Sequence, residues 1–318
     1  MQIPKEDVLD KFKGCMLGSA LGDAIGELAF RYTSREKLLS AVDENDMLRY
    51  TDDTAMAIGI AGSLIENEGE LNLHHLGETF RKNFQKEPWR GYGQGPPHIF
   101  DMVSKGEKES YVEAAKTLFG GEGSMGNGSA MRIAPVGIFF KDEERVVKEA
   151  ERSAEVTHAH ELSKDGAAVL ASAINIASDH HCKASAAERL KPVETAERLS
   201  KIARTEVLAE ALEEVKELLE SETKREEAAR RLGTDILIHR SVPYSIFSFL
   251  AAPHSFEEAL MNAIMVRGDR DTIGAMTCAL SGAYLGKSSI PEHLLQKLEN
   301  HEYIESLAIQ LFELSPYI

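Results

Sequence analysis

Two acidic clusters in the chain carry the residue types that hold hard metal ions. Thr51-Asp52-Asp53 and Gly268-Asp269-Arg270-Asp271-Thr272 each stand where a loop is expected to enter a helix. Oxygen ligands suit Mg²⁺, Mn²⁺ or Ca²⁺, and four carboxylates would balance two divalent ions. Two such ions about 3.5–4 Å apart polarise a leaving group and lower the pKa of a bound water. The alternative is ordinary capping, because carboxylates and hydroxyls also stabilise helix N-termini.

Two glycine-rich segments are candidates for binding a phosphorylated ligand. The segment 120–129 reads GGEGSMGNGS and contains a GxGxxG match, and the segment 90–95 reads RGYGQG. No βαβ pattern surrounds the match and no Gly-Lys-Ser/Thr follows it, which argues against a dinucleotide fingerprint and a Walker loop. A glycine-rich loop before a helix can still bind a diphosphate through its backbone N–H groups. A plain flexible turn is the alternative.

The composition excludes several classes of protein. The 318 residues include 36 Lys+Arg and 52 Asp+Glu, a formal net charge of −16, so no nucleic-acid partner is expected. The chain has no run of 18 apolar residues, so no membrane span is expected. The N-terminus lacks the apolar core of a signal peptide. Cys15, Cys182 and Cys278 form no CxxC pair, which indicates reduced thiols and a cytoplasmic location.

Small residues at helical spacing predict how the two clusters are brought together. Gly14, Gly18 and Gly22 recur at steps of four, as do alanines 275, 279 and 283 near the other end of the chain. Glycine inside a helix costs roughly 1 kcal/mol relative to alanine, so such a row indicates a second helix packed closely against it. We therefore expect a central pair of helices, one from each end of the chain.

The remaining pattern is also helical, and strand signals are few. Helices are expected over 54–68, 73–86 with Asn72 as N-cap, 142–157, 161–177 and 241–252, with a capping box at Ser255. The charged stretch 194–232 is expected to form a solvated pair of helices. The fold class predicted is all-α, with a single domain spanning residues 1–318.

Seven segments, in this order, resemble the ADP-ribosylglycohydrolase family. They are GCMLGSALGDAIGE, YTDDTAMAIG, RGYGQG, GSMGNGSAMRIAPVG, THAHELSKDGA, SVPYSIFSFL and GDRDTIGAM, and the resemblance extends over about residues 12 to 286. The glycine-rich segments are most similar to the branch that cleaves poly(ADP-ribose), ADP-ribosyl-serine and O-acetyl-ADP-ribose. The arginine-directed branch, which includes the dinitrogenase reductase-activating enzymes, is more distant.

The resemblance implies a compact orthogonal multi-helix domain with two Mg²⁺ ions, replaceable by Mn²⁺, in a central cleft. The implied metal ligands are Thr51, Asp52, Asp53, Asp269, Asp271 and Thr272. The predicted catalytic residues are Asp53 and Asp269, with Glu27 as a substitute for a glutamate of the family pattern. The implied substrate-binding residues are Gly91 and Gly93 at the ribose, Phe119 and Met125 at the adenine, Gly123, Ser124, Gly126 and Asn127 at the diphosphate and distal ribose, and His158 near the phosphates.

The chain departs from the family pattern at two positions. Many relatives carry a glutamate four residues after the second glycine of GDxxG, where this chain has Phe30, while Glu27 lies three residues earlier. We expect Glu27, Asp53 or a metal-bound water to take over the role of that glutamate. Met125 stands where the nearest relatives carry a tyrosine that stacks on adenine, and methionine covers a ring less well.

The function predicted is Mg²⁺-dependent hydrolysis of O-linked ADP-ribose, with ADP-ribosylated proteins as partners and a monomeric enzyme. One alternative is an ADP-ribosyl-arginine hydrolase of the dinitrogenase reductase-activating type. A second is a non-catalytic ADP-ribose binder or a crystallin-like relative. A third is an all-α nucleotide pyrophosphatase, although no ExxE pairing accompanies the acidic clusters.

Overall fold

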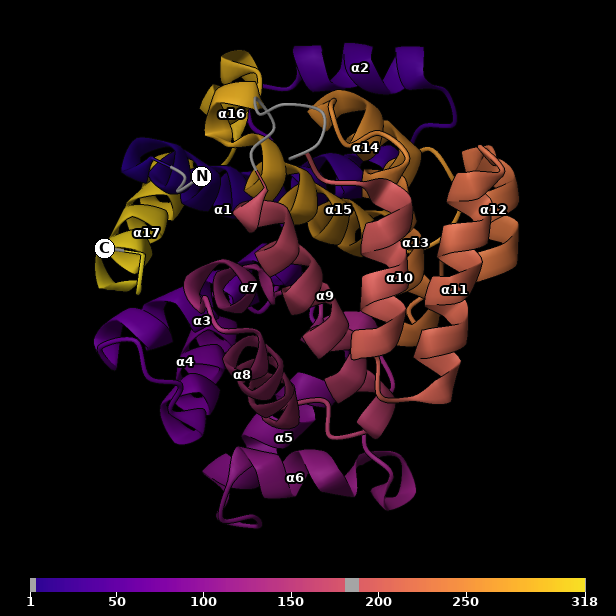
Figure 1. The fold of residues 1–318 in the computed structure, drawn as a ribbon. Helices are drawn as coiled ribbons and strands as arrows, with labels where there is room; N and C mark the ends of the chain where they lie inside the picture. Colours follow the sequence, from indigo (N-terminus) through magenta and orange to yellow (C-terminus); the bar gives the residue numbers. More distant parts are fainter. Residues whose placement is uncertain (1–3, 181–188, 318) are drawn as a thin grey trace.

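Helices form all the regular structure in the computed structural model, which describes residues 4–180 and 189–317 (Figure 1). Extended pairing in these ranges is limited to two isolated bridges, Leu48 with Leu298 and Gly126 with Leu237. The all-α prediction is therefore confirmed. In chain order the helices are α1 (Lys5–Ala29), α2 (Arg35–Glu44), α3 (Asp52–Glu66), α4 (Leu73–Lys86), α5 (Gly95–Ser104), α6 (Tyr111–Thr117), α7 (Ala134–Phe139), α8 (Glu143–Glu155), α9 (Glu161–Asp179), α10 (Pro192–Ile202), α11 (Glu206–Glu220), α12 (Arg225–Leu232), α13 (Ile238–Leu250), α14 (Phe256–Ile264), α15 (Arg270–Leu285), α16 (Glu292–Lys297) and α17 (His301–Leu314), with short 3₁₀ turns at Leu118–Gly121, Asn127–Ser129 and Lys287–Ser289.

The first helix, α1, packs directly on α15 near the other end of the chain (Figure 1). Their backbones touch: a Cβ atom at Gly18 would lie 2.5 Å from the Cys278 carbonyl oxygen. A Cβ atom at Gly22 would lie 2.6 Å from the Gly274 carbonyl carbon. The predicted central pair is thus present, and glycine is required because no side chain fits between the two backbones.

The face of α15 that touches α1 differs from the predicted alanine row. It consists of Gly274, Cys278 and Gly282, one residue earlier in each turn than Ala275, Ala279 and Ala283. The alanines are buried as well. Because neighbouring helices enclose α15 on several sides, small residues recur on more than one of its faces, and spacing alone does not distinguish them.

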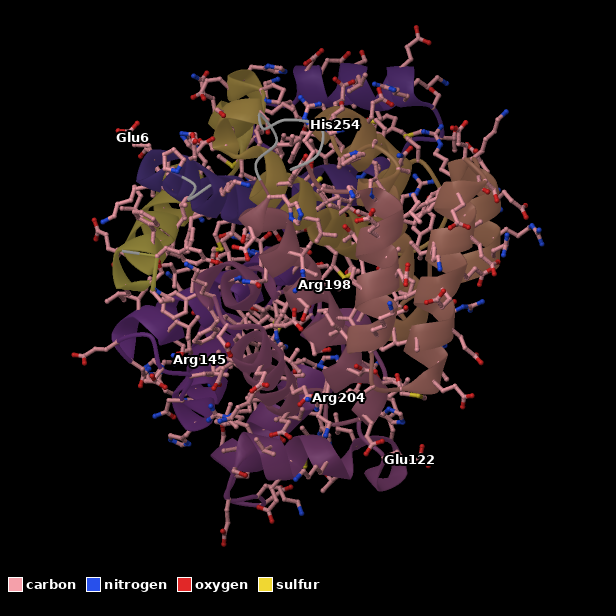
Figure 2. The ribbon with its side chains drawn as sticks, viewed as in Figure 1. Glu6, Glu122, Arg145, Arg198, Arg204 and His254 are labelled. Atoms are coloured by element: carbon pink, nitrogen blue, oxygen red, sulfur yellow. The ribbon has the colours of Figure 1, made fainter. Side chains whose placement is uncertain are left out.

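The charged stretch forms three helices, α10, α11 and α12, on one side of the molecule (Figure 1), so the predicted pair is wrong in number. The first break is fixed from outside the stretch, because the buried Asp165 accepts hydrogen bonds from the backbone N–H groups of Arg204 and Thr205. A carboxylate from another helix carries no signal in the local pattern. Figure 2 shows charged side chains around the edge of the molecule, with Glu122 at its lower margin.

Other helix boundaries show which local signals are reliable. The structure confirms α4 and its N-cap, since Asn72 Oδ1 accepts from the His75 N–H at 3.0 Å, and Ser255 caps α14. In contrast, α13 begins at Ile238 rather than residue 241 and contains Pro243. Its start follows from the Ile238 N–H, which donates to the Met125 carbonyl at 3.1 Å.

The remaining predictions concern thiols and membrane spans. Cys15 and Cys278 are buried free thiols, and Cys182 lies outside the described ranges. Within those ranges no helix is both long and apolar enough to cross a bilayer.

Candidate active site

The N-terminus of α3 is held by a carboxylate from α1. Asp23 is fully buried, and its side chain accepts hydrogen bonds from the backbone N–H and hydroxyl groups of both Thr51 and Thr54, at 2.6–3.1 Å. The Thr51 side chain makes no capping bond to its own helix. Asp23 was absent from the predicted site. A single acid in the otherwise uncharged stretch 14–26 of α1 is the sequence signal that could have revealed it.

Asp53 lies beside this contact and has an unused oxygen. The Thr51 hydroxyl stands 3.0 Å from Asp53 Oδ2, whereas the buried Oδ1 has no hydrogen-bond partner. A buried carboxylate oxygen without a donor is costly, because it has lost water without replacement. A cation at this position would satisfy it.

The start of α15 presents its aspartates in the same way. Asp269 makes no capping bond to its own helix, and its Oδ2 accepts from Asn127 Nδ2 at 2.6 Å. Asp271 Oδ1 accepts from the Thr272 N–H at 2.9 Å. The intervening Arg270 donates to the carbonyls of Ala29 and Tyr32 and so ties the end of α1 to this loop.

The aspartates of the two clusters share an environment that disfavours negative charge. Burial raises the pKa of Asp52, Asp53 and Asp271 well above the usual range, and the negative charges of neighbouring aspartates raise it further. Burial also raises the pKa of Asp23, although hydrogen bonds from Thr51 and Thr54 oppose this. Over the described residues, no three His, Cys, Asp or Glu side chains stand in a geometry that could hold a metal ion.

The glycine loops adopt conformations that other residues tolerate poorly. Gly91 and Gly123 have φ values of 90° and 78°. A Cβ atom at Gly91 would lie 3.8 Å from Asp52 Oδ1, so this loop passes over the first acidic cluster. A Cβ atom at Gly128 would lie 2.8 Å from Nε2 of the buried His158, so the second loop passes over this ring.

Both acidic clusters and both glycine loops contribute residues to one cavity of about 320 Å³. The predicted residues that line it are Asp52, Asp53, Gly91, Gly93, Phe119, Ser124, Gly126, Asn127, His158, Asp269, Asp271 and Thr272. The size is at the lower end of the range for pockets that bind small ligands. Residues more than 200 positions apart in the sequence, such as Asp52 and Asp271, therefore line the same cavity.

Four predicted residues do not line this cavity. Thr51 is bound to Asp23 through its hydroxyl group, and Gly123 gives its loop a positive φ value. Met125 is 38% exposed at the surface. Glu27 is partly buried one turn after Asp23 on α1, next to Gly26, whose added Cβ would lie 2.6 Å from Asp271 Cα.

The cavity also has lining residues that the sequence analysis missed. Among them are Ile236, Thr157 and Gly128. Ile236 reaches the site because its carbonyl accepts from the Asn127 N–H at 2.9 Å, a contact across more than 100 residues. Such a contact leaves no local pattern in the sequence.

Comparisons with known proteins identify the family of the chain. The family model described as ADP-ribosylglycohydrolase matches residues 4–317. The chain belongs to the ADP-ribosylglycohydrolase family. It is 32% identical to the human protein named ADP-ribosylhydrolase ARH3, over 95% of this chain and 93% of that protein. It is 27% identical to the Serratia proteamaculans protein named ADP-ribosylarginine hydrolase Tri1, over 99% of this chain and 82% of that protein.

A solved structure supports the fold as well. A chain titled ADP-ribosylglycohydrolase-related protein complex superposes with a TM-score of 0.72 at 21% identity, covering 98% of this chain and 99% of that one. The all-α arrangement is therefore that of an ADP-ribosylglycohydrolase, and the chain is an enzyme of this hydrolase family.

Proposed function

We propose that this chain is a Mg²⁺-dependent hydrolase that releases ADP-ribose from O-linked conjugates: ADP-ribosyl-serine, poly(ADP-ribose) or O-acetyl-ADP-ribose. The observation that carries the proposal is that neither Thr51 nor Asp269 caps its own helix. Helix capping was the alternative explanation of both acidic clusters. Instead the aspartates of both clusters line one cavity with the glycine loops.

The donor atoms of the site are of the type that hard divalent cations take, and the carboxylates would have to move closer together to coordinate two of them. Asp53 Oδ1 is buried without a partner. The pKa values of Asp53 and Asp271 are raised by burial first and by repulsion from neighbouring aspartates second, and a bound cation would offset both effects. The ions would be held by the residues Thr51, Asp52, Asp53, Asp269, Asp271 and Thr272, with water completing the shell. Thr51 can give its hydroxyl proton to a carboxylate and keep a lone pair for a cation. When bound, Mg²⁺ or Mn²⁺ would polarise the leaving oxygen and acidify a water.

The rest of the cavity fits the parts of ADP-ribose. Phe119 is 71% exposed at the rim, where its ring could stack on adenine. Ser124, Gly126 and Asn127 would bind the diphosphate and distal ribose, with His158 beneath them. Gly91 and Gly93 would border the ribose near Asp52.

The reaction needs a proton acceptor near the anomeric carbon. Hydrolysis breaks the bond between C1″ and the substrate oxygen, adds the oxygen of water to C1″, and moves one water proton to the leaving oxygen. Asp53 or Glu27 would take that proton and return it. Asp269, held by Asn127, would fix the position of the distal ribose. We further propose that the enzyme acts as a monomer on ADP-ribosylated proteins in the cytoplasm.

The experiment is a substrate panel with serine, arginine, polymeric and O-acetyl linkages, each assayed with Mg²⁺ and with EDTA. We expect release of ADP-ribose in Mg²⁺ alone, and loss of most activity in Asp269→Asn and Asp271→Asn. The exposed Asp46→Asn is a charge-matched control that should retain activity. Full activity in EDTA would refute metal dependence. Phosphate-ester products would indicate a pyrophosphatase, and no turnover would indicate a binding protein.

A further inference from the structure

A hydroxyl group connects a buried arginine to the histidine under the glycine loop. Arg132 Nη2 donates to Thr157 Oγ1 at 2.7 Å, and Thr157 Oγ1 lies 2.7 Å from His158 Nδ1. Arg132 and Thr157 have no exposed surface, and His158 is 7% exposed. Water therefore does not compete for these hydrogen bonds.

The number of protons fixes the direction of each bond. Arginine has donors only, so Thr157 Oγ1 accepts from Arg132. The single hydroxyl proton of Thr157 is left to be donated, and His158 Nδ1 is the acceptor that the structure offers. Nδ1 then carries no proton, and the proton of the neutral imidazole lies on Nε2.

We propose that Arg132 and Thr157 are positioning residues that hold His158 as the Nε2–H tautomer and direct this N–H at an anionic oxygen of the ligand. The identity of that ligand, the diphosphate of ADP-ribose, rests on the proposed function. The tautomer does not, because it follows from the hydrogen bonds of the protein alone.

The position of Nε2 supports the proposal. A Cβ atom would lie 3.4 Å from Nε2 if built at Gly126 and 2.8 Å from it if built at Gly128, so the loop crosses this edge of the ring. No described residue forms a hydrogen bond with Nε2, although His158 lines the cavity. An N–H here would reach the oxygen of a ligand that also contacts Ser124.

The guanidinium group of Arg132 is held by hydrogen bonds and an aromatic ring rather than by a carboxylate. Its guanidinium donates to the Ser153 carbonyl and lies 4.7 Å from the centre of the Phe80 ring. Within the described ranges no carboxylate lies at ion-pair distance from Arg132, and Asp52 attracts its charge only from farther away. Burial and the Arg132 charge lower the pKa of His158 to about 3, which keeps the ring neutral.

The test compares Thr157→Val with Thr157→Ser, using long-range ¹H–¹⁵N spectra of the histidine rings and calorimetry with ADP-ribose. Wild-type His158, assigned by its loss in His158→Gln, should show Nε2–H only. Thr157→Val should populate the Nδ1–H tautomer and weaken ADP-ribose binding by about tenfold, the effect of one misdirected hydrogen bond to a charged group. Thr157→Ser should keep the Nε2–H tautomer and the wild-type affinity for ADP-ribose. Thr195→Val, which removes another buried hydroxyl far along the chain on α10, should change neither.

An Nδ1–H or charged His158 in the wild-type protein would overturn the proposed role of Arg132 and Thr157, as would a Thr157→Val spectrum identical to the wild type. An Nε2–H tautomer without any ADP-ribose binding would contradict the ligand and the proposed function, while the role of Arg132 and Thr157 in fixing the tautomer would stand.

Discussion

Asp23 shows how one buried carboxylate can organise a site without lining it. Its oxygens accept from Thr51 and Thr54 and thereby hold the start of α3, where Asp52 and Asp53 are presented. Asp165 makes an equivalent contact with Arg204 and Thr205 ahead of α11, outside the cavity. The chain thus contains its own control for the role of Asp23.

Asp23→Asn should lower both the free energy of unfolding and the response to Mg²⁺. An amide N–H₂ would face N–H and O–H donors, at a cost of about 2–3 kcal/mol. Asp165→Asn should lose similar stability in urea but keep the Mg²⁺-induced rise in melting temperature. A full Mg²⁺ response in Asp23→Asn would show that the α3 cluster does not depend on this contact.

Glu27→Gln tests whether this residue replaces the glutamate that is absent at Phe30. Glu27 stands near the start of α15, whereas the Phe30 side chain is 50% exposed. We expect a rate about 100-fold lower with an unchanged melting temperature, because losing a general base has this size of effect. A loss below about threefold, measured at saturating substrate, would assign water activation to Asp53 or to a metal-bound water.

His158 gives a dependence of stability on pH. Its pKa is lowered to about 3 in the folded protein, against about 6.5 in the unfolded chain, so the unfolded state binds the extra proton below pH 6.5. Stability is lost as the pH falls from 6.5 toward 3. Between pH 7 and 5 the wild type should lose about 2 kcal/mol more than His158→Gln in urea unfolding. Equal losses would mean that the ring is protonated in the folded state.

The site residues differ in how far the sequence could reveal them. Asp52, Asp53, Asp269 and Asp271 were found because carboxylates gathered at two expected helix starts. Asp23 was missed because a single acid in an otherwise uncharged stretch forms no cluster. Ile236 was missed because it reaches the cavity through a backbone contact with Asn127. Local sequence patterns do not show which distant segments of the chain contact each other.

At the scale of elements, the α1–α15 contact decides where the two acidic clusters meet. The second cluster forms the start of α15, and the first, at the start of α3, is held to α1 by Asp23, while the α1 and α15 backbones touch along several turns. The pairing was predicted because rows of small residues recur at steps of four. The register was wrong because α15 has small residues on more than one face.

Gly22→Ala should therefore destabilise the protein by about 3 kcal/mol or more, since the new methyl group would overlap the Gly274 backbone. Gly62, in the middle of α3, has no atom within 4 Å of an added Cβ. Gly62→Ala should be neutral or stabilising by up to about 1 kcal/mol, because alanine favours the helix. Urea unfolding of both variants measures the difference. Equal stabilities would contradict the close backbone contact.

At the scale of the whole molecule, the placement of free and paired carboxylates bears on which linkage is cleaved. An arginine conjugate has a cationic guanidinium leaving group, which the proposed metal ions would repel and which would need an acidic subsite. The carboxylates near the glycine loops in sequence are already paired: Asp101 lies 2.7 Å from Lys105, and Glu87 lies 3.1 Å from Arg90. Neither lines the cavity.

We therefore expect ADP-ribosyl-serine or O-acetyl-ADP-ribose to be cleaved in preference to ADP-ribosyl-arginine. An ester or ether oxygen can be stabilised by a metal ion as negative charge develops on it. The mouse and human proteins named ARH3 are 32% identical to this chain, and Tri1 is 27% identical. Serine and arginine conjugates at equal concentration, competing for the same enzyme, give the ratio of kcat/KM directly. Faster release of ADP-ribose from the arginine conjugate would place the enzyme with the arginine-directed branch, and an acidic subsite would then have to form from Glu87 or Asp101 by breaking its ion pair.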